Sequence, residues 1–238
     1  MASPEFKYYN VSRKQYVSPL FDLIPNEKIP LILLIAFLAP VFFLPCAATE
    51  STTPIWANET RLGKYQDAWN ILNQTDVYYL VKSTFNTADY LWGQNFTCVN
   101  VRHTYLDQKT VVSNFSFLNA SSNGKRFSLD LRTMPLSTYN YTQQNAIQYE
   151  LHNCSLLNDT VIYSDGETCN LLSIPYETCG MGCELWVNEK YLKNGTTPAC
   201  CFFLFDLLCA DKGNYDIYHK QCDAEQERET ELSPTTKQ

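Results

Sequence analysis

Residues 110–133 read TVVSNFSFLNASSNGKRFSLDLRT, and this stretch decides the fold class. Apolar and polar residues alternate from Thr110 to Leu118 and again from Lys125 to Thr133, which is typical of strands with one buried face. Asn123-Gly124 lies between the two runs and is a turn signal. The stretch therefore predicts two consecutive β-strands.

The same alternation, rich in β-branched and aromatic residues, recurs on both sides of this pair. Turn signals such as Asp165-Gly166 and Gly180 to Gly182 separate the runs. The six further predicted strands are Val77–Phe85, Phe96–Tyr105, Ala146–His152, Asp159–Ser164, Cys169–Ile174 and Cys183–Asn188. Eight short strands predict an all-β protein, either an up-and-down barrel or a sandwich. A closed barrel of this size holds one small ligand.

Two segments follow a helical period instead. Leu62 to Leu72 places apolar side chains at helical spacing, and Pro198 to Leu208 opens with a proline, which suits a first helical turn. The second segment is apolar nearly all round, so we expect the barrel wall to cover it.

An uncharged apolar run extends from Ile29 to Cys46 and is followed by small residues. This pattern predicts a signal peptide over residues 29–48, and the alternative is an uncleaved signal anchor. Residues 1–28 form an atypical leader that we interpret as sequence upstream of the true start. Residues 49–60 form an N-terminal segment, 61–222 the barrel, and 223–238 a disordered acidic tail.

Nine N-x-[ST] sequons lie downstream of the apolar run and indicate passage through the secretory pathway. Their asparagines are Asn58, Asn73, Asn95, Asn114, Asn119, Asn140, Asn153, Asn158 and Asn194. The same compartment allows disulfides, and the chain has 10 cysteines. We therefore expect a secreted, extracellular glycoprotein.

The acidic charge excludes some partners. Loss of residues 1–48, with four basic and three acidic residues, changes the net charge from −7 to −8. Nucleic acid and membrane surfaces are poor partners for such a charge, whereas a cationic ligand is compatible with it. No G-x-S-x-G, phosphate loop or H-E-x-x-H is present, and the three histidines are not spaced as a metal pair. We expect no enzyme activity, no catalytic residue, no cofactor and no metal.

Several ordered pieces of the chain resemble the tick salivary lipocalins called histamine-binding proteins. They include QDAW at 66–69, VYYLVKST at 77–84, WGQNFTC at 92–98, IYSD at 162–165 and ELW at 184–186. The resemblance covers residues 61–222. It implies a closed eight-stranded antiparallel lipocalin barrel with a helix at each end. It also implies a monomer that sequesters a biogenic amine, histamine or serotonin, without catalysis.

The resemblance also implies site residues, since a buried cation needs carboxylates and aromatic faces add cation–π attraction. The positions that match the family are Asp89, Trp92, Asp130, Tyr149, Asp159 and Glu184. Two depart from it: Phe85 replaces a tyrosine and Asn170 an aspartate. We expect Asp89, Asp130 and Glu184 to point into the barrel, with Trp92 and Tyr149 lining the same space.

Each of these residues has a plainer interpretation. Asp89 lies in a predicted loop and is then a solvated acid, while Asp130 lies on either the inner or the outer face of its strand. A glycan at Asn158 would expose the segment that holds Asp159. Trp92 and Tyr149 are then core residues.

For the cysteines, the resemblance implies a bond between Cys98 and Cys222, and one from Cys169 to Cys200 or Cys201. It assigns no partner to Cys154, Cys179, Cys183 or Cys209. Nine cysteines remain after signal cleavage and cannot all pair within one chain, so one thiol is free or joins another chain.

Two other functions remain open. Phe85 and Asn170 make the lumen less anionic, which favours a lipid mediator such as a leukotriene or fatty acid. The third hypothesis is a modulator of host defence that binds a host protein through its loops. The number of carboxylates that face the lumen distinguishes the amine from the other hypotheses: two or more favour an amine.

Overall fold

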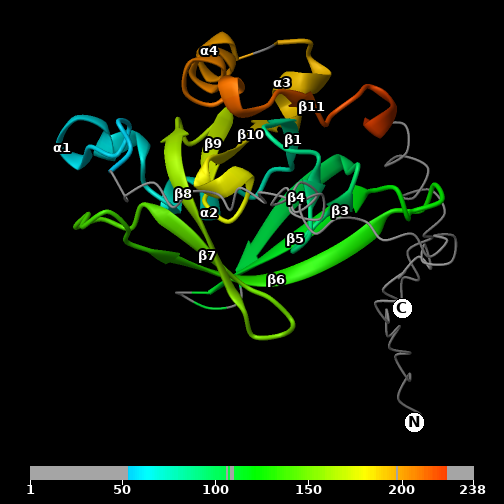
Figure 1. Cartoon of the computed structure of the whole chain (residues 1–238), viewed down its shortest axis with the longest axis horizontal. Helices are drawn as coiled ribbons and strands as arrows, with labels where there is room; N and C mark the ends of the chain where they lie inside the picture. Colours follow the sequence, from blue (N-terminus) through cyan, green and yellow to red (C-terminus); the bar gives the residue numbers. More distant parts are fainter. Residues whose placement is uncertain (1–52, 106, 108–109, 197, 224–238) are drawn as a thin grey trace, which may run out of the picture. The chain divides into compact units, whose positions relative to one another are not determined.

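The computed structural model describes residues 53–223, except 106, 108–109 and 197. Eight strands form a closed antiparallel barrel in which each pairs with its neighbour in sequence, and the last pairs with the first (Figure 1). They are β1 (Tyr78–Ser83), β4 (Thr97–Tyr105), β5 (Val111–Leu118), β6 (Phe127–Leu136), β7 (Ala146–Glu150), β8 (Leu156–Ser164), β9 (Cys169–Ile174) and β10 (Gly182–Asn188). The barrel is therefore correct and the sandwich wrong.

The predicted leader, signal peptide and acidic tail fall on residues 1–52 and 224–238, and so lie almost wholly outside the described residues. Within the described part of the chain, no helix is long and apolar enough to cross a membrane.

The strands differ from the prediction mainly at their ends. β6 continues to Leu136, because Pro135 and its neighbours still pair with β7. β8 begins at Leu156 instead of Asp159, because residues 156–158 pair with β7 across a short turn. Two short additions were not predicted. The β2–β3 hairpin (Thr87–Ala88 and Gly93–Gln94) lies in the loop after β1. β11 (Tyr215–Asp216) pairs with the last two residues of β1.

Alternation assigns the side chains of β10 to two different cores. Trp186 belongs to the apolar cluster inside the barrel, whereas Leu185 and Val187 belong to a second cluster beneath the C-terminal helix. β9 divides in the same way, with Leu172 inside and Leu171 outside. These two strands are buried on both faces.

The predicted N-terminal helix is broken into α1 (Glu59–Leu62), a 3-10 turn (Gly63–Tyr65) and α2 (Trp69–Leu72). The cause is polar. The Gln66 side chain donates to the carbonyls of Trp56 and Ile162, at 2.8 and 3.0 Å. The Asp67 carboxylate then accepts the Trp69 N–H at 2.9 Å, which starts a new turn. Helical spacing alone did not reveal this break.

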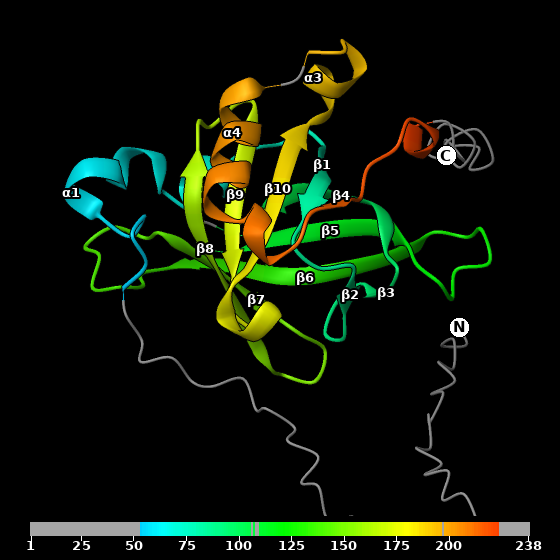
Figure 2. The ribbon, with the colours of Figure 1, turned by 45° about the horizontal axis from the view of Figure 1, so that its top comes forward.

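The C-terminal helix α4 (Ala199–Leu208) follows Pro198 and packs on the outer face of β9 and β10 (Figure 2). Only one stripe of it is buried: Phe203 and Leu207 are 61% and 64% exposed. The expectation of full coverage is therefore wrong, because a helix lying on one sheet contacts it along one side only. A further helix, α3 (Glu189–Lys193), was not predicted and begins at the Asn188 cap.

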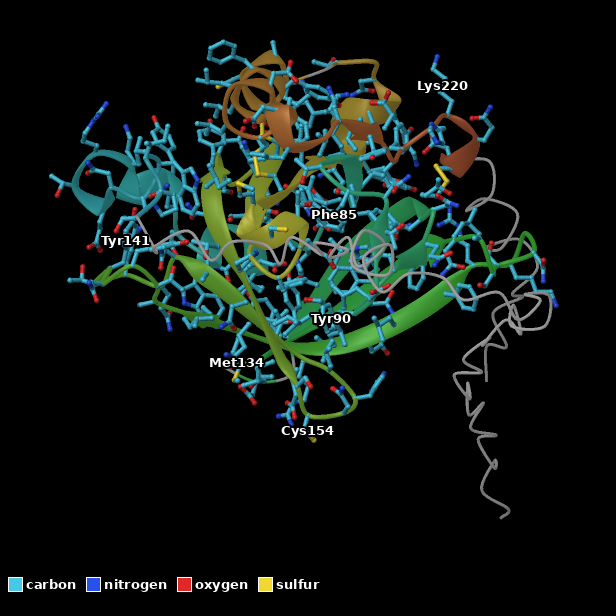
Figure 3. All side chains as sticks on the ribbon, viewed as in Figure 1. Phe85, Tyr90, Met134, Tyr141, Cys154 and Lys220 are labelled. Carbon is cyan, nitrogen blue, oxygen red and sulfur yellow. A yellow bond between two sulfur atoms is a disulfide. The ribbon has the colours of Figure 1, made fainter. Side chains whose placement is uncertain are left out.

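Disulfides tie these elements together. Cys98–Cys222 and Cys169–Cys201, with Cα atoms 5.2 and 6.5 Å apart, are pairs that the resemblance implies. A third bond, from β10 to the end of α4, joins Cys183 to Cys209. Cys179 is bonded as well. The described residues contain two exposed free thiols, Cys154 and Cys200, and Figure 3 shows Cys154 at the tip of the β7–β8 turn.

Candidate functional site

Two carboxylates lie inside the barrel, from Asp159 on β8 and Glu184 on β10, and each residue is 3% exposed. Both carboxylates accept hydrogen bonds from neutral aromatic side chains. The indole N–H groups of Trp92 and Trp186 donate to the two oxygens of Glu184, at 3.3 and 3.1 Å. The hydroxyl of Tyr176 donates to Asp159 at 2.9 Å. Two indoles and a tyrosine hydroxyl therefore orient the two buried acids, and Tyr149 is a further hydrogen-bond partner of Asp159.

Burial governs the protonation of this pair. It raises the pKa of Glu184 from 4.5 to about 7, against the opposing effect of the two indole hydrogen bonds. Burial, followed by repulsion from Glu184, raises the pKa of Asp159 well above its usual range. Neither carboxylate has a lysine or arginine partner among the described residues. Since an unpaired buried charge is costly, the empty pair favours protons, and a bound cation would replace them.

Strand alternation and a loop contact position the indoles. Glu184 and Trp186 are two residues apart on β10 and therefore share its inner face. Trp92 comes from the loop after β1, and the Asn119 amide donates to its carbonyl at 2.7 Å. The Trp92 ring lies against Phe115, with centroids 4.9 Å apart. Trp92 thus packs in the core and also donates to Glu184, so its two interpretations are compatible.

A small cavity of about 20 Å³ borders this cluster. Its lining residues are Ile71, Tyr78, Val101, His103, Phe115, Tyr149, Asn170, Leu172 and Trp186. That volume holds about one water molecule, far below the several hundred Å³ of ordinary ligand pockets. A ligand larger than water therefore requires side chains to move. Tyr149 and Trp186 are placed to respond, because each contacts both the cavity and a carboxylate.

The cavity carries a neutral polar group, His103. Its Nδ1 lies 2.9 Å from the Ser113 hydroxyl, which lies 2.7 Å from the hydroxyl of Thr133. Burial lowers the pKa of His103 to about 4, so the ring is neutral at physiological pH. Sequence reasoning missed His103, although it alternates with Val99 and Val101. Tyr176 was also missed, because it lies in a turn that has no periodicity.

The two departures from the family pattern are buried. Asn170 accepts from the Ser164 hydroxyl at 2.8 Å and donates to Gln74 at 2.9 Å. A neutral network thus stands at the position where the resemblance implies an aspartate. Phe85, labelled in Figure 3, packs edge-on against Phe96.

Two predicted acids do not reach the lumen. Asp130 is exposed on the outer wall, where the Asn114 amide donates to it, because it has the strand parity opposite to buried Leu131. Asp89 is exposed in the loop after β1. Asp159 is inward although Asn158 carries a sequon, since consecutive strand residues face opposite sides.

The sequon asparagines divide by exposure. Six are exposed: Asn58, Asn73, Asn95, Asn140, Asn153 and Asn194. The other three, Asn114, Asn119 and Asn158, are half-buried and have hydrogen-bonded side chains.

Comparison with known proteins places this geometry in context. The tick histamine binding protein family matches residues 56–224. The chain is 30% identical over 189 residues to the female-specific histamine-binding protein 1 of Rhipicephalus appendiculatus, covering 78% of this chain and 96% of the relative. It is 35% identical over 156 residues to the male-specific histamine-binding salivary protein of that tick, covering 63% and 76%. Insecticyanin from the tobacco hornworm Manduca sexta has the same fold, with a TM-score of 0.50, 12% identity and coverage of 66% and 85%.

Proposed function

The chain belongs to the tick histamine-binding protein family, and on that premise we propose that it is a secreted protein that sequesters a biogenic amine. Histamine is the first candidate and serotonin the second. The ammonium group of the amine binds between Asp159 and Glu184. The family consists of small-ligand binders, and the absence of an enzyme motif from the sequence accords with action by stoichiometric binding.

One observation carries the proposal: among the described residues, the two buried carboxylates have no lysine or arginine partner, and their side-chain hydrogen-bond donors are neutral aromatic groups. Such a pair is costly to the empty protein, and an ammonium ion relieves both the desolvation and the mutual repulsion. The rings of Trp92, Trp186 and Tyr149 supply faces for a flat ligand and for cation–π attraction.

The acidic groups in the lumen also distinguish an amine from the alternative ligands. A fatty acid would add a third buried carboxyl group beside Asp159 and Glu184 without a cation to pair with any of them, whereas an amine brings a positive charge that pairs with both. Two inward carboxylates therefore favour an amine over an anionic lipid mediator. The protein-binding hypothesis draws on surface loops and makes no use of this pair.

Calorimetric titration of the refolded domain with histamine, serotonin and a leukotriene tests the proposal. We expect amine binding at pH 7.5, with a loss of tenfold or more in Glu184→Gln and Asp159→Asn. Asp130→Asn is the matched control, because it removes the same charge from the outer wall and should leave the affinity unchanged. Binding of the leukotriene alone, or amine affinity insensitive to both inner variants, would contradict the proposal.

A further inference from the structure

The end of the barrel nearest Glu184 is closed by two loops: the segment after β1, with its β2–β3 hairpin, and the β9–β10 turn (Figure 2). They meet through two tyrosines. Tyr90, labelled in Figure 3 and 58% exposed, packs edge-on against Tyr176, with ring centroids 6.0 Å apart. Tyr176 in turn donates to Asp159. Tyr176 thus links the exposed Tyr90 to the buried carboxylate of Asp159.

Glu177 lies in the same turn and is unusual. Its Oε1 atom is buried and has no hydrogen-bond partner among the described residues, which costs the protein free energy. The turn is tightly packed at this point: a Cβ added at Gly182 would lie 2.9 Å from the Cβ of Glu177, so position 182 requires glycine. Burial and the charge of Asp89 raise the pKa of Glu177.

Four carboxylates therefore follow one another from solvent to lumen. Asp89 is exposed, Glu177 half-buried, and Glu184 and Asp159 are fully buried. Each repels the next in the series, which destabilises the empty protein. The ionised members of the series attract an approaching cation toward the lumen.

The opposite end of the barrel offers no such route. Helix α2 closes it with fully or nearly fully buried Ile71 and Leu72. A polar cleft of about 330 Å³ lies there, and both of its acids have partners: Asp76 pairs with Lys190 at 2.7 Å, and Glu167 accepts a hydrogen bond from the Tyr191 hydroxyl at 2.8 Å. The acids of this cleft are hydrogen-bonded, whereas the buried Oε1 atom of Glu177 at the other end has no partner among the described residues, and this difference distinguishes the two ends.

We propose that Glu177 is the entrance carboxylate that a cationic ligand meets on its way to Glu184, and that it sets the rate of association. The inference rests on the proposed amine binding and adds to it a residue outside the lumen. Charges at the rim of a site act mainly on the association rate and its salt dependence, because they attract the ligand before the final contacts form.

Stopped-flow tryptophan fluorescence with histamine tests this, since Trp92 and Trp186 contact Glu184 and should report binding. We expect Glu177→Gln to slow association roughly 3- to 10-fold at low salt and to flatten its salt dependence. Glu167→Gln is the matched control: the exposed Glu167 lies in the β8–β9 turn at the opposite end, and its variant should stay within about twofold of the parent.

Asp89→Asn is a second variant whose exposed position leaves folding intact, and it should slow association by a smaller factor. Association rates equal to the parent's in both variants, with normal histamine affinity, would overturn the entrance role and leave amine binding standing. Failure of the parent protein to bind any amine would overturn both.

Discussion

The pH dependence of stability provides a direct test of the buried Glu184. Its pKa rises from 4.5 to about 7 on folding because the carboxyl is buried. A raised acid pKa contributes stability that is fully present below pH 4.5 and is lost as the pH rises to about 7. Above pH 7 the ionised side chain costs the folded protein about 3 kcal/mol, and most of this cost appears between pH 5 and pH 8.

Glu184→Gln removes that titration. At any pH the variant also leaves one of the indole N–H groups of Trp92 and Trp186 without its carboxylate oxygen, which costs about 1–3 kcal/mol. This second cost does not vary with pH, so the comparison of two pH values isolates the charge. Relative to the parent, the variant should be about 2–3 kcal/mol more stable at pH 8 than at pH 5, or roughly 5–10 °C in melting temperature.

Urea unfolding of the ligand-free protein, with disulfides intact, at pH 5 and pH 8 measures this double difference. Asp130→Asn removes an exposed carboxylate and should show no such pH-dependent gain. If the free-energy difference between Glu184→Gln and the parent is the same at both pH values, Glu184 is not a buried acid with a raised pKa. The reasoning about a proton-favouring site would then fail.

Three further predictions follow from the same structure. Amine binding near pH 7 should release protons, because a cation stabilises the ionised forms of Glu184 and Asp159; calorimetry in buffers of different ionisation enthalpy would measure the number, and a value of zero would contradict it. Replacing both Cys98 and Cys222 by serine should lower the free energy of unfolding by about 5 kcal/mol on the chain-entropy model, since their bond spans 124 residues; a loss below about 1 kcal/mol in urea titrations would count against that account. Asn170→Asp should strengthen amine binding by adding a carboxylate beside the cavity, and unchanged histamine affinity at fixed pH and salt would reject it.

Much of the fold was predictable from local patterns. All eight barrel strands follow from alternation, because one face of each packs in the lumen and the side-chain period of a strand is two. The break in the N-terminal helix was not predictable in this way. It depends on Gln66 reaching the carbonyls of Trp56 and Ile162, and Ile162 lies 96 residues away in the sequence.

The candidate site shows the same division. The sequence by itself determined that acids and aromatic residues occur at alternating strand positions, and its resemblance to a family selected Asp159 and Glu184 among them. Alternation states that two residues lie on opposite faces but does not say which face is inside, so Asp130 was assigned to the lumen although it faces solvent.

Only the tertiary structure decided which acids share a low-dielectric space. β9 pairs with β8 on one edge and with β10 on the other, which brings the two acids close together, and Tyr176 in the β9–β10 turn donates to Asp159. Trp92, which lies 92 residues from Glu184 in the sequence, is added as a donor only by the tertiary fold. The pKa of a carboxylate depends on its burial and on nearby charges, and both are properties of the folded chain. The unpartnered oxygen of Glu177 likewise exists only once the β9–β10 turn has closed over it.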